Sequence, residues 1–284
     1  MKPRLATADF TFPLLPHDDA LDLIAALGFE GVDIGLFAGR SHVRPEHAFT
    51  DVAASAKDLA HRVYERGLDF ADIFVQAAPD FTSLAPNHPD ASVRRASRDA
   101  FSRGLEMVVR CNGRHMTALP GAPFEGEAAA DSLSRCADEL AWRVAQAQAV
   151  GVTFSVEPHI GSVVPTPKLA AELVARCPGL TLTLDYCHFV SRGTPDGEIE
   201  PLLAHASHFH ARGARADRVQ ASVKENTVDY ARVVQQMRAV GYDKWIGVEY
   251  VWSEWEHCNE VDNLSETILL RDQLKQAIAA EDWS

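Results

Sequence analysis

Residues 153–157, TFSVE, and residues 181–185, TLTLD, are two short runs that each end on a carboxylate. Successive side chains of a β-strand point to opposite faces, so alternate residues of a run share a face. Glu157 therefore shares its face with the small polar residues of its run, and the hydrophobic residues point the other way. Asp185 has the same place in the second run. Each run predicts a strand with a hydrophobic face toward helices and a polar inward face that ends on a charged group.

Two further strand-like runs also end on a residue that can bind a metal ion. Residues 205–210, HASHFH, end on a histidine, and residues 245–249, WIGVE, end on a glutamate. If the four ends converge, three carboxylates and one imidazole form a site for a hard or borderline divalent cation. The alternative is a polar rim made of unrelated helix caps and surface charges. The candidate metal ligands are Glu157, Asp185, His210 and Glu249.

Segments of strand period and helix period alternate along the chain. Strands are predicted at residues 4–8, 31–36, 68–76, 115–119, 152–157, 180–185, 206–210 and 245–250. Helices are predicted at residues 18–27, 51–66, 93–110, 131–150, 167–176 and 228–240, most of them ending at glycine or proline. Eight strands alternating with helices predict an α/β fold, a (β/α)8 TIM barrel that forms a single domain over residues 1–284. The alternative, an open doubly wound sheet, lacks a GxGxxG or phosphate-binding loop after its first strand.

Composition narrows the functional class. The formal net charge of −13 disfavours nucleic acid as a partner, because such a surface repels phosphate backbones. The N-terminus lacks a signal-peptide pattern, and no apolar run is long enough to span a membrane, so we expect a cytoplasmic protein without a membrane partner. The five cysteines are scattered and form no CxxC pair, which argues against a disulfide framework or a thiolate zinc site.

Five segments resemble the sugar isomerase/epimerase superfamily with the xylose-isomerase-like barrel. They are LDLIAALGFEGVDIG at residues 21–35, VEPHIGSVVPTP at 156–167, LTLDYCHFVSRG at 182–193, HFHARG at 208–213 and IGVEY at 246–250. The resemblance covers nearly the whole chain in order. It implies the barrel fold and a reaction within a group that contains ketose 3-epimerases, hydroxypyruvate isomerases, inosose and dehydroshikimate dehydratases, and a DNA endonuclease branch.

The resemblance also implies roles for individual residues. The four candidate ligands match the single-metal site of the family. His188 matches a histidine that contacts a substrate oxygen, and Arg212 or Arg215 stands where many members have a cationic residue. We expect the substrate-binding residues to be His188, Arg212, His159 and Trp252. Alternatively, the two histidines and the tryptophan have a structural role and pack beside the site without contacting the substrate.

Such a site supports proton transfer next to a carbonyl group. A divalent ion that chelates a carbonyl oxygen and its neighbouring hydroxyl acidifies the intervening C–H and stabilises the enediolate. Glu157 and Glu249 are the candidate acid and base. We therefore expect a metal-dependent isomerase or epimerase of a small ketose or keto-polyol. The alternative on the same site is a dehydratase or lyase that eliminates a β-leaving group from a keto-cyclitol or keto-glycoside, with Trp252 and Trp255 as walls.

The donor set suits Mn²⁺ best, with Mg²⁺, Co²⁺ and Zn²⁺ as alternatives. The expected partner is a small-molecule carbohydrate, and exposed aromatic residues on long loops suggest a homo-oligomer. Two other functions were considered. An endonuclease would need an Asp-x-His motif, which the stretch after His210 lacks. The other is a non-catalytic sugar-binding protein.

Overall fold

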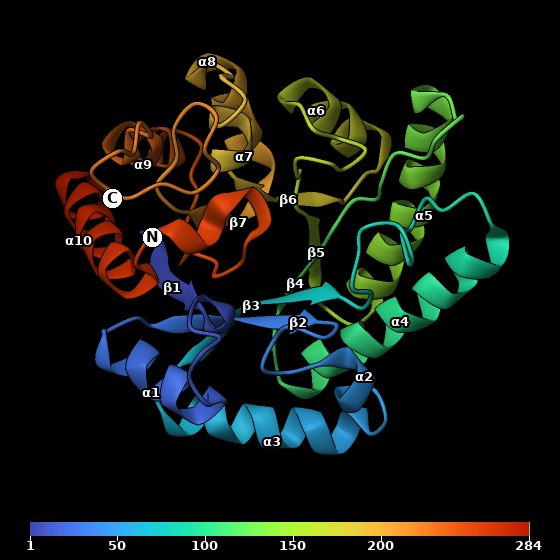
Figure 1. Cartoon of the computed structure of the whole chain (residues 1–284), viewed down its shortest axis with the longest axis horizontal. Coiled ribbons are helices and arrows are strands. Elements are labelled where there is room, and N and C mark those ends of the chain that lie inside the picture. Colours follow the sequence, from blue (N-terminus) through green and yellow to red (C-terminus); the bar gives the residue numbers. More distant parts are fainter. Residues whose placement is uncertain (284) are drawn as a thin grey trace.

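A computed structural model describes residues 1–283, which form a single-domain barrel (Figure 1). Eight parallel strands close on themselves in sequence order, with β1 pairing both β2 and β8. The strands are β1 (Arg4–Ala8), β2 (Gly31–Phe37), β3 (Asp69–Gln76), β4 (His115–Ala118), β5 (Thr153–Val156), β6 (Thr181–Asp185), β7 (Ala206–Ala211) and β8 (Trp245–Val248). The predicted (β/α)8 barrel is confirmed, and each predicted strand lies within two residues of an observed one.

Helices surround the strands on the outside of the barrel (Figure 1). The longer ones are α1 (His17–Ala26), α3 (Val52–Glu65), α4 (Ala91–Arg110), α5 (Ala129–Ala149), α6 (Pro167–Arg176), α9 (Tyr230–Ala239) and α10 (Asn263–Ala280). Short helices are α2 (Pro45–Ala48), α7 (Cys187–Val190) and α8 (Asp196–Ile199), with 3-10 turns η1 (Asp9–Thr11), η2 (Glu200–His205) and η3 (Trp255–Glu260). None of the helices within residues 1–283 has the length and apolar character needed to cross a membrane.

Helix α10 was not among the helices predicted from the sequence. Asp262 caps this helix by accepting hydrogen bonds from the backbone N–H groups of Leu264 and Ser265. The apolar residues of α10 are not confined to one face, so the helix lacks the amphipathic period by which the other long helices were predicted. Its buried residues pack against the rest of the core nonetheless. Tertiary packing rather than sequence period defines this helix.

Side-chain parity places hydroxyl groups in the middle of the barrel. Thr183 Oγ1 lies 2.7 Å from Thr117 Oγ1 and 2.6 Å from Ser155 Oγ. Phe154 points the other way, and its ring packs at 5.1 Å, centroid to centroid, against Phe101 of α4. The predicted orientation of the strand at residues 153–157 is therefore confirmed. A barrel interior this polar holds its shape by hydrogen bonds between strands as well as by packing.

Gly247 of β8 makes room for a carboxylate inside the barrel. Asp33, on β2, is fully buried, and its Oδ2 lies 3.0 Å from Nε2 of His208. A Cβ atom on Gly247 would lie 2.0 Å from the same Asp33 oxygen. Only a glycine leaves space for this carboxylate at the centre of the barrel.

We expect the substitution Gly247→Ala to destabilise the fold by about 1–3 kcal/mol, because the added methyl group displaces the Asp33 carboxylate in a closely packed interior. Urea unfolding followed by circular dichroism measures this change. Gly197→Ala is the matched control, since a Cβ at that exposed glycine of α8 meets no atom within 4 Å. Equal stability of the Gly247→Ala protein and the natural protein would contradict this account of the barrel interior.

Candidate metal and substrate site

The four predicted strand ends lie together at the carboxyl end of the barrel. Asp185 is the last residue of β6, and His210 is the next-to-last residue of β7. Glu157 and Glu249 each come one residue after a strand, yet their backbone N–H groups continue the ladder by donating to the carbonyl groups of Ala118 and Ala211. Parallel strands bring their carboxyl ends to one face, where barrel enzymes hold their active sites. The structure therefore brings the four predicted ligands to one place.

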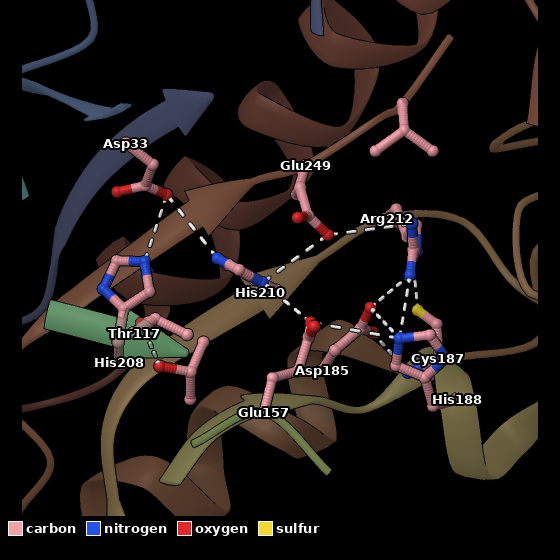
Figure 2. Close-up of polar contacts among 12 residues, drawn as sticks. Asp33, Thr117, Glu157, Asp185, Cys187, His188, His208, His210, Arg212 and Glu249 are labelled. Atoms are coloured by element: carbon pink, nitrogen blue, oxygen red, sulfur yellow. Dashed lines mark hydrogen bonds and ion pairs between the residues drawn. The ribbon is translucent and has the colours of Figure 1, made fainter. Parts of the chain in front are cut away.

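His210 stands between the two glutamates (Figure 2). Its Nδ1 lies 3.2 Å from Oε1 of Glu157 and 3.5 Å from Oε2 of Glu249, and all three side chains are buried. One donor atom from each of the three residues lies within 4.8 Å of the others, a spacing that could hold a metal ion. Burial alone would lower the pKa of His210, but Glu249, Glu157 and Asp33 raise it to about 10. The raised pKa of the His210 imidazole thus reflects the negative charge of the carboxylates around it.

Asp185 is held by an arginine. Arg212 forms an ion pair with Oδ2 of Asp185, and its Nη1 lies 3.6 Å from Oε2 of Glu249. The other Asp185 oxygen, Oδ1, accepts a hydrogen bond of 2.8 Å from the backbone N–H of Cys187. Asp185 and Glu249 offset the burial of Arg212 and raise the pKa of its guanidinium well above the usual value. Arg212 is thus the cation that Asp185 contacts, so a metal ion would compete with it for this carboxylate.

The donor set fits a divalent cation. Glu157, His210 and Glu249 present oxygen and nitrogen atoms toward one point, and Asp185 adds a third carboxylate next to them. Carboxylates and imidazole are ligands for Mn²⁺, Mg²⁺, Co²⁺ or Zn²⁺. The Nε2 atom of His210 has no hydrogen-bond partner within the described chain, and Oδ2 of Asp33 lies 3.8 Å from it. That arrangement resembles a metal-bound histidine whose outer nitrogen faces a carboxylate.

The predicted substrate histidines adjoin these groups. His188 Nε2 lies 3.3 Å from Oδ2 of Asp185 and 3.9 Å from Oε1 of Glu157. Its ring centroid lies 4.2 Å from that of His159. Burial lowers the pKa of His159 to about 3, and burial together with Arg212 lowers the pKa of His188 well below the usual value. Both rings are therefore neutral near pH 7 and can exchange hydrogen bonds with a substrate oxygen.

A cavity of about 260 Å³ opens above this group, and Glu157, His159, His188, Arg212 and Glu249 line it. Aromatic side chains form much of the remaining wall: Phe10, Phe37, Phe74, Phe81 and Trp255. The Trp255 ring stacks on His159 with centroids 5.0 Å apart.

Two of the candidate residues lie outside the cavity. Trp252 is 42% exposed and is not among the residues that line the cavity. The aromatic wall of this loop is Trp255, three residues later. Arg215 points to the surface, where its Nε lies 3.9 Å from Glu225. Of the two arginines considered from the sequence, the structure brings Arg212 into the site.

Several residues of the site were not predicted from the sequence. Asp33 and His208 lie next to His210, and Arg40 and Gln76 line the cavity. Asp33 could have been predicted from the alternation of side chains along its strand, because it shares a face with the two glycines of the run GVDIG. No pattern marked Arg40, which follows the strand in an irregular loop.

A model of the xylose isomerase-like TIM barrel family matches residues 21–274. The chain belongs to this family. A comparison with curated proteins finds no match.

Solved structures of the xylose isomerase-like TIM barrel share the fold at low sequence identity. D-psicose 3-epimerase from Clostridium cellulolyticum H10, solved with D-tagatose, is 12% identical with a TM-score of 0.76, over 97% of this chain and 99% of that one. The probable 3-DHS dehydratase involved in petrobactin synthesis from Bacillus anthracis is 13% identical with a TM-score of 0.71, over 95% and 99%. An AP endonuclease of family 2 from Brucella melitensis is 20% identical with a TM-score of 0.73, over 95% and 98%. The likeness shows a shared fold among proteins named for three reactions.

We expect His210→Gln to abolish binding of a divalent ion, because the imidazole nitrogen lies between the two glutamates. Plasma mass spectrometry of protein loaded with Mn²⁺ and then desalted should give roughly one ion per natural chain and far less for the variant. His61→Gln is the control, since His61 is an exposed histidine on α3 that pairs with Glu65. Equal metal content in the His210→Gln and natural proteins would remove His210 from the ligand set.

Proposed function

We propose that this chain is a divalent-metal-dependent isomerase or epimerase of a small ketose or keto-polyol. The observation that carries the proposal is the placement of two buried glutamates, Glu157 and Glu249, on either side of His210 at the floor of an aromatic-walled cavity. Proton transfer next to a carbonyl needs an acid and a base within reach of one carbon atom, and this pair offers both.

Glu157, Asp185, His210 and Glu249 are the residues that would hold the ion, and the three carboxylates with one imidazole favour Mn²⁺. When bound, the ion would supply Lewis-acid stabilisation of negative charge on substrate oxygen atoms. Arg212 contacts Asp185 and Glu249 and lines the cavity, so it would hold a cationic group beside the substrate.

The chain's own groups supply the proton chemistry. Burial raises the pKa of Glu249 to about 8, while His210 and Arg212 act in the opposite direction. A carboxyl group with such a pKa can give or take a proton near neutral pH. If Glu157 and Glu249 act on opposite faces of one carbon, the configuration at that carbon inverts. If one of them moves the proton between adjacent carbons, an aldose and a ketose interconvert.

The remaining residues position the substrate. Neutral His188 and His159 would hydrogen-bond substrate hydroxyl groups, and the aromatic wall would exclude water from the reacting carbon. A small carbohydrate suits the cavity of about 260 Å³. Nucleic acid is disfavoured as a substrate by the net charge of −13 and by the lack of an Asp-x-His motif after His210.

A dehydratase or lyase is the second candidate, favoured by Trp255. This ring stacks on His159 and gives the cavity a flat wall next to His188. A flat wall suits a cyclic substrate such as a keto-cyclitol. The same proton abstraction would then be followed by departure of a group from the β-carbon.

We expect Glu157→Gln and Glu249→Gln each to lower turnover by about 10²–10⁴-fold while the fold is retained, because each change removes an acid or base and leaves the side-chain shape intact. Steady-state assays on ketose substrates, with circular dichroism as the check on folding, measure this. Glu106→Gln, an exposed change on α4, should leave turnover unchanged. Near-natural turnover in both site variants would overturn the proposed mechanism.

Incubation of ketoses and keto-cyclitols in deuterated water separates the two candidate reactions. Epimerisation or isomerisation incorporates deuterium at carbon and keeps the substrate's composition otherwise, whereas elimination releases water or an aglycone. Proton NMR and mass spectrometry distinguish these products. We expect carbon-bound deuterium without loss of water from a ketose, and an eliminated product would instead select the lyase.

A further inference from the structure

Arg40 is a cationic residue at the mouth of the cavity. It follows β2 by three positions and lines the cavity together with Gln76. Its Nη2 donates a hydrogen bond of 2.6 Å to Oε1 of Gln76, and its guanidinium carbon lies 4.3 Å from the centroid of the Phe37 ring. A guanidinium that stacks on a ring and bonds an amide is held in orientation before any ligand arrives.

The guanidinium of Arg40 has no acidic partner. Within residues 1–283, no carboxylate forms an ion pair with it, and its side-chain hydrogen bond goes to a neutral amide. Arg212, the other arginine of the cavity, pairs with Asp185 and Glu249. A guanidinium carries five N–H donors in a planar fork, so most of those on Arg40 remain available to a ligand. The residue is also exposed to solvent, which keeps it accessible from the cavity mouth.

Arg40 faces the same space as the two glutamates. Arg40, Glu157 and Glu249 all line the cavity. A ligand group bound to the open donors of Arg40 would therefore lie in the same cavity as the candidate acid and base.

We propose that Arg40 binds a carboxylate of the substrate, so that the substrate is a keto sugar acid or keto-polyol acid rather than a neutral ketose. This rests on the proposed metal-dependent function and extends it. One planar guanidinium matches a carboxylate through two parallel N–H···O bonds. Arg40 presents one such fork at the cavity mouth, whereas a phosphate dianion usually needs more donors, such as several backbone N–H groups.

Binding of two matched ligands tests the proposal. D-Fructose and D-fructuronate share the keto group and differ in a CH2OH group against a carboxylate at C6. Isothermal titration to Mn²⁺-loaded protein should show D-fructuronate binding at least about tenfold more tightly than D-fructose, the size expected for hydrogen bonds to a charged group. Arg40→Gln should reduce this preference to less than about threefold, and Arg40→Lys should leave an intermediate preference, because lysine keeps the charge but loses the fork.

Arg44→Gln is the matched control. Arg44 belongs to the same loop but points its Nε at the carbonyl group of Ser41, and it does not line the cavity. This variant should keep the full preference for the acid. The proposal is overturned if the natural protein binds the acid no more tightly than the neutral sugar, or if Arg40→Gln keeps the preference.

Failure here is distinguishable from failure of the proposed function. Metal content and deuterium incorporation depend on the glutamates and His210, so they would be unaffected by a wrong assignment for Arg40. If the natural protein neither binds the metal ion nor incorporates deuterium into a ketose, the proposed function itself is wrong. Thermal unfolding of the Arg40 variants checks that the fold is intact, which we expect for an exposed residue.

Discussion

Three buried carboxylates share one small space at the carboxyl end of this barrel, and their mutual repulsion is the constraint on which the site depends. Glu157, Asp185 and Glu249 are each less than 5% exposed. Like charges held this close in a medium of low polarity are unfavourable unless cations lie among them. Arg212 and the imidazole of His210 lie among these carboxylates. A divalent ion bound by the same carboxylates would offset their repulsion further.

The barrel supplies the rigidity that this arrangement needs. Strands β5 to β8 place the four groups by backbone pairing, and the hydroxyl cluster below them ties the inner faces of β4, β5 and β6 together. Asp33 lies beside His210 (Figure 2), in the space that Gly247 leaves open. Loops, by contrast, carry Arg40 and Trp255. The proposed metal ligands, acid and base thus lie at strand ends, and two of the residues proposed to contact a substrate lie in the segments that follow strands, as is common in this fold.

Much of this fold and site could be predicted from local sequence. Period-two alternation gave the strands and the inward direction of Glu157 and Asp185, because parity along a strand fixes which face a side chain occupies. Helix α10 was missed because its apolar residues lack a single face. The pairing of Asp185 with Arg212 could not be predicted, since it depends on how two side chains from different strands extend. The same limit applies to the loop after β8, where the structure places Trp255 rather than Trp252 against the histidines.

The central claim is that the ends of β5 to β8 hold one divalent ion, and crystallography with anomalous scattering tests it most directly. Crystals of the protein grown with MnCl2 and measured on both sides of the manganese absorption edge would locate the ion. We predict a single anomalous peak within bonding distance of Glu157, His210 and Glu249, with Asp185 turned from Arg212 toward it. A map without a peak among these residues, or with the manganese bound elsewhere on the barrel, would contradict the account.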